Sequence, residues 1–331
     1  MPSGIREKLI YILEILKKTD EDHPVNTTDI LRQLKLYGIE AERKSVSRDI
    51  GILTGMGYSI ITCPETRKGY YMTDQLFESY ELKLITDAVC QARFLTVEDT
   101  QRLLKKLRSL ATKGCEEALD AMTYIDPGIK SKNNRVRYAV DKIITAITKR
   151  KKITFRYFEY VAGNRLAYKR DGHIYRISPY YLVWRNEEYF LIGNPDSHGR
   201  LTHFRVEMMA DLEISDEPRR PAEEIEDLRG QFDPGEYIRR SVDMFTGDKI
   251  NVTLRCSNIV RQEILRRFGS AIAIRDDGTE RFIAHFAVND TIGLRRFLLS
   301  FDPELLRLES PAQLKAELLA AAEKTAKAYR D

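Results

Sequence analysis

The chain has 331 residues, of which 43% are hydrophobic and 31% are charged, and its net charge at pH 7 is +4. This length predicts two or three domains, and this composition is typical of a globular protein. No run approaches the roughly 20 apolar residues that span a bilayer, and the N-terminal segment lacks the apolar core of a signal peptide. The four cysteines are scattered without metal-binding spacing. We therefore expect a cytoplasmic protein with no membrane segment, metal or cofactor.

The charge is distributed unevenly along the chain. Residues 130–185 hold 15 Lys and Arg against 3 Asp and Glu, a local net charge of +12, whereas residues 186–240 have a local net charge of −7. Such a basic block indicates a face that attracts anions. The alternative is a mixed surface whose opposite charges neutralise each other once the chain folds.

Three helices and a hairpin are predicted within residues 1–75. Apolar side chains recur at helical spacing from Ile5 to Leu16. Residues 26–28 offer cap oxygens to a second helix, which Gly38 ends. A third helix follows over residues 43–57, and two strand-like runs flank the polar turn of residues 63–69.

The third predicted helix has the features of a DNA-reading helix. Val46, Ile50 and Leu53 form its buried stripe, so the polar residues of its first two turns face outwards. A helix that enters the major groove needs long donors there, because Arg can pair with guanine and Ser with phosphate. The candidate DNA-binding residues are Arg43, Lys44, Ser45, Ser47 and Arg48 on this helix and Arg67 and Lys68 at the hairpin tip. The alternative is an ordinary helical bundle, since the basic and acidic side chains of residues 1–75 are equal in number.

Residues 75–135 read as a helical connector. Apolar stripes that include Leu82 and Leu104 indicate either packing between domains or a dimerisation segment, since DNA-binding helices commonly come in pairs that match two half-sites. Residues 126–135 are rich in turn-forming and basic residues and make the best linker candidate.

A short helix and six strand-like runs over residues 136–216 predict a small barrel or a strongly bent sheet. Aromatic and Arg residues interleave there, and such a mixture can stack on bases and hold phosphates. The candidate ligand-binding residues are Arg156, Tyr157, Arg176, Ser178, Trp184, Arg185, Tyr189 and Arg205. The alternative is that the aromatic rings fill the core while the Arg side chains cap its rim.

The remaining residues, 217–331, predict a polar connecting helix over 217–230 and then a βαββαβ order, which suggests a ferredoxin-like fold. Within it, a hairpin is expected to turn at residues 276–278. A closing helix has apolar spacing at Leu314, Leu318, Leu319 and Ala322.

Three groups of residues resemble one family of regulators, in the same order along the chain. The winged helix of DeoR/YafY-like regulators is matched by Arg48, Asp49, Ile50, Leu53, Gly57, Gly69, Tyr70 and Tyr71, with Glu42 where many relatives carry Ser. The WYL domain is matched by Pro179, Leu182, Tyr189, Phe190, Leu191, Phe204 and Arg205, with Met208 in place of a second Arg. The WCX extension is matched imperfectly by residues 242–245.

This resemblance implies an α+β multidomain protein and a role. The expected parts are a winged helix-turn-helix DNA-binding domain (1–74), a helical connector (75–135), an SH3-like or Sm-like WYL β-barrel that senses a ligand (136–216) and a ferredoxin-like WCX domain (217–331). The expected protein is a homodimeric transcriptional regulator that binds double-stranded DNA. Its WYL-like domain is expected to sense a nucleotide, an oligonucleotide or another nucleic-acid-type anionic effector.

No catalytic constellation stands out, so we expect that the chain is not an enzyme. The five histidines lack metal-binding spacing, and no glycine-rich phosphate loop occurs. Ser178 or Ser197 could be imagined as a nucleophile with His198 as its base, but no acid that would complete a triad is identifiable. Two other classes stay open: an accessory protein that binds single-stranded nucleic acid or oligonucleotides, and an assembly module that binds no nucleic acid.

Overall fold

The structure is a computed structural model that describes residues 3–63, 69–163 and 165–330. It divides into two compact units, residues 1–134 and 135–331, which are described separately. Within the described ranges, no helix combines the length and the apolar character needed to cross a membrane.

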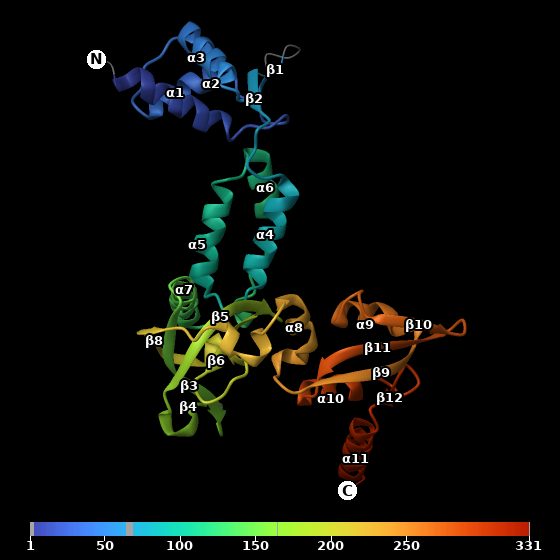
Figure 1. Cartoon of the computed structure of the whole chain (residues 1–331). Helices are drawn as coiled ribbons and strands as arrows, with labels where there is room; N and C mark the ends of the chain where they lie inside the picture. Colours follow the sequence, from blue (N-terminus) through green and yellow to red (C-terminus); the bar gives the residue numbers. More distant parts are fainter. Residues whose placement is uncertain (1–2, 64–68, 164, 331) are drawn as a thin grey trace. The chain divides into compact units, whose positions relative to one another are not determined.

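The first unit begins with three helices and a two-stranded hairpin (Figure 1). Their bounds are α1 Ser3–Leu16, α2 Thr27–Leu36, α3 Arg43–Gly55, β1 Ile60–Cys63 and β2 Gly69–Met72. The Asn26 side chain caps α2 by accepting from the N–H groups of Thr28 and Asp29 at 2.8 and 3.0 Å. Gly38 lies just beyond the end of α2 with a φ of +74°. Both features agree with the predicted start and end of this helix.

These helices pack around one apolar core. The stripes predicted from the sequence supply its buried side chains, namely Ile12, Leu16, Ile30, Leu34, Val46, Ile50 and Leu53. Because the apolar stripe of α3 is turned into this core, the opposite face of α3 is left to solvent.

Three more helices complete the first unit, α4 Ser79–Gln91, α5 Val97–Arg108 and α6 Lys113–Met122. Leu82 of the predicted stripe is buried in their core beside Leu119. The Nζ of Lys18, just past α1, donates to the carbonyls of Ser109 and Ala111 at 2.6 and 3.0 Å. This lysine therefore joins the two groups of helices.

The segment predicted as a linker is anchored to the first unit. It contains a 3₁₀ turn, η1 (Pro127–Ile129). The buried Lys130 then donates from Nζ to the carbonyls of Val89 and Ala92 at 3.1 and 3.0 Å, at the end of α4. A cation at this helix end satisfies two carbonyls that lack a partner within the helix.

The second unit begins with α7 (Arg135–Thr148) and a six-stranded sheet (Figure 1). Its strands are β3 Lys151–Val161, β4 Arg165–Tyr168, β5 Tyr175–Arg185, β6 Glu188–Pro195, β7 Thr202–Arg205 and β8 Met209–Pro218. The order is β4–β3–β5–β6–β7, β8 also pairs with β3, and all ladders are antiparallel. Each strand-like run of the sequence is thus a strand. Because β7 and β8 form no ladder among the described strands, the sheet is an open half-barrel and not the closed β-barrel that the resemblance implied.

Residues 219–248 connect this sheet to the next one. The predicted polar helix over 217–230 is wrong, since the segment forms two 3₁₀ turns, η4 (Ala222–Glu224) and η5 (Glu226–Leu228). Ile225 and Leu228 are buried three positions apart against the sheet, and this spacing suits a 3₁₀ turn. No sequence pattern indicated α8 (Pro234–Arg240) or the turn η6 (Val242–Met244) that follow.

The C-terminal part has the predicted βαββαβ order. Its elements are β9 Lys249–Ser257, η7 Asn258–Val260, α9 Arg261–Phe268, β10 Ala273–Asp277, β11 Arg281–Asn289, α10 Ile292–Leu299, β12 Leu306–Ser310 and α11 Ala312–Ala328. The sheet order is β10–β11–β9–β12, all antiparallel. The hairpin turns at residues 278–280, slightly later than predicted, because Asp277 still pairs with Arg281. Of the predicted stripe in α11, Leu314 is buried, but Leu319 is 61% exposed.

Candidate functional site

The outer face of α3 carries most of the residues predicted to bind DNA. Arg43, Lys44, Ser47 and Arg48 are exposed in its first two turns. Glu42, the residue before the helix, makes no side-chain cap, so the first N–H groups of α3 stay open to an acceptor. Arg43 is steered towards α2, since its Nη2 donates to the Thr28 hydroxyl at 2.8 Å.

The inner side of α3 is fixed to α1 by a polar contact that the sequence did not suggest. Lys8 and Asp49 form an ion pair of 2.9 Å, and each residue is less than a tenth exposed. The Lys8 ammonium also donates to the Ser45 hydroxyl. Ser45 is half-buried and bound to α1, whereas its predicted companions on α3 point outwards. Ser45 therefore helps to hold α3 against α1.

The hairpin lies against the start of α2. Tyr70 in β2 and Val25 exchange two backbone hydrogen bonds of 2.9 and 2.8 Å. Gly69 precedes Tyr70 with a φ of +98°, and a Cβ there would lie 2.0 Å from the Val25 carbonyl oxygen. Only glycine allows this approach. The predicted tip residues Arg67 and Lys68 lie outside the described residues.

Three of the predicted ligand-binding arginines are paired with carboxylates of the acidic block. Arg156 lies 3.4 Å from Asp211, and Arg176 lies 2.7 Å from Glu217. Arg205 contacts both Glu188 and Glu207. Folding thus joins the basic stretch of the sequence to the acidic stretch that follows it, which lowers the positive potential of this face.

Two other predicted ligand residues lie inside the sheet. Tyr157 stands among the rings of Phe155, Tyr175 and Phe204, with centroids 6.0 to 6.3 Å away, and its hydroxyl accepts from the Arg205 N–H at 3.0 Å. Burial raises the pKa of Tyr157, so its phenol stays protonated. Ser178 is fully buried. Both side chains therefore pack or form hydrogen bonds inside the sheet.

The last three members of the predicted set lie around the β5–β6 hairpin. The rings of Trp184 and Tyr189 stack with centroids 6.4 Å apart, and Trp184 is 45% exposed. Arg185 is half-buried and donates to the Ile238 carbonyl in α8 at 3.0 Å. Burial lowers the pKa of Arg185, and the neighbouring charge of Arg267 adds to this effect. The eight predicted residues are therefore spread over the inside of the sheet, its outer face and the β5–β6 turn.

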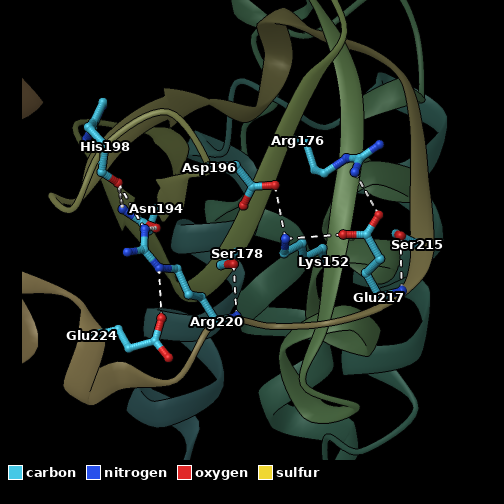
Figure 2. A network of polar contacts seen from close by, with 10 residues as sticks. All are labelled: Lys152, Arg176, Ser178, Asn194, Asp196, His198, Ser215, Glu217, Arg220 and Glu224. Carbon is cyan, nitrogen blue, oxygen red and sulfur yellow. Dashed lines mark hydrogen bonds and ion pairs between the residues drawn. The ribbon is translucent and has the colours of Figure 1, made fainter.

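A polar network lies at the end of these strands that is opposite the β5–β6 turn (Figure 2). Lys152 lies between Asp196 and Glu217 at 3.0 and 3.2 Å, and Arg176 approaches Glu217 from the other side (Figure 2). Although partial burial opposes it, these contacts raise the pKa of Lys152. The network keeps the end of β8 on β3.

Arg220 extends this network into the β6–β7 loop (Figure 2). Its Nη1 donates to the Asn194 side chain at 3.1 Å and its backbone N–H to the Ser178 hydroxyl at 3.1 Å. Asn194 is fully buried and donates to the carbonyls of His198 and Arg200 at 2.7 and 2.8 Å. The loop that begins after β6 therefore has a defined shape.

That loop borders an open pocket of about 840 Å³ in the second unit. The walls come from five segments: the loop with the start of β7, the turn η5, the helix α8, residues 246–249 at the start of β9, and Asn289 at the end of β11. Sequence reasoning missed this site, because no one segment shows a pattern of chemistry and the segments lie far apart in the chain. All eight predicted ligand residues are described, and none of them lines this pocket.

Family models match both parts of the second unit. Residues 138–214 match the WYL domain, and residues 248–326 match the WCX domain. The chain carries a WYL and a WCX domain. The WYL match runs from α7 into β8, and the WCX match covers the C-terminal sheet and most of α11.

Solved structures give weaker likenesses. Proteasome accessory factor B/C (PafBC) of Arthrobacter aurescens is 17% identical over 95% of this chain and 47% of its own, with a TM-score of 0.32, so the chain spans about half the length of that protein. A CRISPR Cas-related protein is 14% identical over 99% of this chain and 85% of its own, with a TM-score of 0.39. Both scores are below 0.5, so neither likeness informs the function. No curated protein matches the chain.

Proposed function

We propose that the chain is a DNA-binding transcriptional regulator with a winged helix-turn-helix at its N-terminus. The supporting observation is the two-sided character of α3: Val46, Ile50 and Leu53 are buried, while Arg43, Lys44, Ser47 and Arg48 are exposed in the first two turns. Donors at these positions suit the major groove, and the hairpin of β1 and β2 stands where a wing would follow.

The WYL-containing unit is proposed to sense a nucleotide or another nucleic-acid-type anion and to change the affinity of α3 for DNA. A regulator of this kind needs two separate sites whose binding energies are coupled. Two copies of the chain would present two α3 helices to two half-sites, so a homodimer in the cytoplasm is part of the proposal. The ferredoxin-like WCX part would support that assembly. The absence of catalysis stays a prediction.

The alternative of an accessory protein that binds single strands through the WYL domain has less support. It relied on the basic block of residues 130–185. Two arginines of that block, Arg156 and Arg176, are paired with Asp211 and Glu217. The stacked and partly exposed Trp184 favours it.

The direct test is footprinting of the purified protein on duplex genomic fragments at fixed salt. We expect a small set of protected sites, and we expect Arg43→Ala and Arg48→Ala to protect them only at higher protein concentrations than the wild type does, since each base-reading Arg contributes about 1–3 kcal/mol. If no site is protected, or if both variants protect the same sites at the same protein concentration as the wild type, the proposal fails.

A further inference from the structure

The pocket beside the β6–β7 loop holds two separate groups of charges. Asp248 and Lys249 are neighbours in the chain, yet their side chains form ion pairs with different segments. Lys249 lies 3.6 Å from Glu236 in α8, whereas Asp248 lies 2.5 Å from Arg200 in the loop. The pocket therefore has a cationic part at α8 and an acidic part at the loop.

The cationic part has one positive charge more than it has carboxylates. Arg240 and Lys249 line the pocket and share a single carboxylate, Glu236, at 4.0 and 3.6 Å. The guanidinium of Arg240 lies over the Tyr237 ring at 5.6 Å, and the Glu236 carboxylate is 4.0 Å from it, beyond hydrogen-bond distance. A planar guanidinium that lines a pocket in this way suits the oxygen atoms of a phosphate.

The acidic part has the opposite imbalance. Arg200 is the cation there, and it lies between Glu226 at 3.1 Å and Asp248 at 2.5 Å. Asp227 lines the same wall and accepts the Leu201 N–H at 2.8 Å. Three carboxylates against one guanidinium leave acceptor oxygens for a donor group of a ligand.

We propose that this pocket binds a mononucleotide whose base carries an exocyclic amino group. The phosphate would meet Arg240 and Lys249, and the amino group would meet the carboxylates beside Arg200. A volume of about 840 Å³ accommodates a ligand of this size. The inference rests on the proposed function, because it gives the effector of the regulator a place and a chemical class.

Guanine is the base best suited to a carboxylate, because its ring N–H and its amino group form a two-donor edge. Inosine 5′-monophosphate lacks only that amino group. Guanosine 5′-monophosphate and inosine 5′-monophosphate are therefore a matched pair of probes. Guanosine lacks the phosphate and inorganic phosphate lacks the base. These two probes therefore separate the contribution of the cationic part of the pocket from that of the acidic part.

The test is isothermal titration of the full chain with these four probes. We expect guanosine 5′-monophosphate to bind about tenfold or more tightly than each of the other three, since each end contributes charge-assisted hydrogen bonds. Equal binding of the two nucleotides would overturn the role of the acidic part. Equal binding of inorganic phosphate, or no binding of any nucleotide, would overturn the proposal.

Four variants, one of them a control, test the location of the site. Arg240→Gln and Lys249→Gln should each weaken the binding of guanosine 5′-monophosphate by about tenfold. Arg239→Gln, on the same helix but outside this pocket, should keep the affinity within about twofold of the wild type. Lys249 is 54% exposed in its side chain, so its variant should fold even if that of Arg240 does not. Asp248→Asn should reduce the preference for guanosine 5′-monophosphate over inosine 5′-monophosphate. Unchanged binding in Lys249→Gln and Asp248→Asn would contradict the assignment.

Duplex binding by the same preparations separates this inference from the proposed function. If the chain protects genomic DNA but binds no nucleotide, the pocket assignment alone is rejected. If it binds the nucleotide through Arg240 and Lys249 but protects no DNA, the regulator proposal is rejected while the pocket stands.

Discussion

Lys8 and Asp49 form a buried ion pair of 2.9 Å that holds α3 against α1. Asp49 lies one turn after Ser45, so the pair acts on the inner side of the helix whose outer side carries the proposed DNA-binding residues. Burying an ion pair gives little net stability, but removing one partner leaves an uncompensated charge. The pair therefore fixes the orientation of α3 more than it strengthens the fold.

The first prediction concerns this pair. Lys8→Met leaves the Asp49 carboxylate buried without its cation, and we expect a loss of about 3–5 kcal/mol in the free energy of unfolding, measured by denaturant titration. Lys17→Met is the control, because Lys17 pairs with Glu14 at the surface and should cost less than about 1 kcal/mol. The double variant Lys8→Met with Asp49→Leu should recover most of the loss. A double variant as unstable as the single one would contradict this account.

The second prediction concerns Gly69 at the start of β2. Gly69→Ala brings a methyl group within 2.0 Å of the Val25 carbonyl oxygen, so the bridge between Val25 and Tyr70 must open. Gly278→Ala is the matched control, since its φ is +79° but nothing lies within 4 Å of the added methyl group. We expect the control to cost about 1 kcal/mol and Gly69→Ala to cost clearly more in thermal unfolding. Equal losses would mean that the close approach to Val25 has no energetic consequence.

Much of the fold could be predicted from the sequence, because periodicity reports which side of an element is buried. The stripes of α1, α2 and α3 and all six strands of the WYL part follow from it. The turns over residues 222–228 could not be predicted, because their polar composition resembles that of a surface helix. Their conformation depends on where Ile225 and Leu228 insert into a core made by other segments.

The candidate sites were predicted less completely, for a related reason. The outer face of α3 follows from local spacing. The ion pairs of Lys8 with Asp49 and of Arg156 with Asp211 join distant parts of the sequence and become visible only in three dimensions. The pocket at Arg240 is assembled from five segments, so no local sequence motif predicts it.

The third prediction tests the charge neutralisation of the WYL domain. Asp211→Asn together with Glu217→Gln releases Arg156 and Arg176 from their carboxylates. We expect tighter binding of a single-stranded oligonucleotide and a steeper dependence on salt, since more cations are available to phosphates. Fluorescence anisotropy over a range of salt concentrations measures both quantities.

The control for that variant makes the same change in net charge without releasing an arginine. Glu159→Gln together with Asp171→Asn meets this condition, because both residues are exposed and neither has an ion-pair partner among the described residues. If the control gains as much affinity as the test variant, net charge explains the effect and the specific pairs do not.

The fourth prediction concerns pH and His203. Its Nδ1 donates to the Met244 carbonyl at 2.8 Å, so its neutral Nε2 accepts from the Tyr237 hydroxyl at 3.2 Å. Burial lowers the pKa of His203 below its usual 6.5. The folded chain thus takes up the proton less readily than the unfolded chain, and stability should fall as the pH drops below about 6.5.

Thermal unfolding at pH 7.5 and pH 5 tests this effect. The variant His203→Gln should lose less stability between the two pH values than the wild type does. The variant His173→Gln, at an exposed position, should behave like the wild type. A wild-type loss that His203→Gln leaves unchanged would assign the pH dependence to other groups.

The central claim is that α3 reads duplex DNA, and the affinity of single-residue variants for a footprinted site tests it most directly. Anisotropy titrations at several salt concentrations should compare Arg48→Ala and Lys44→Ala with Arg266→Ala, an equal charge change on an exposed residue of α9. We predict that Arg48→Ala costs about 1–3 kcal/mol, that Lys44→Ala lowers the salt slope by about one unit, and that Arg266→Ala changes neither. If all three variants bind the site like the wild type, α3 does not read DNA.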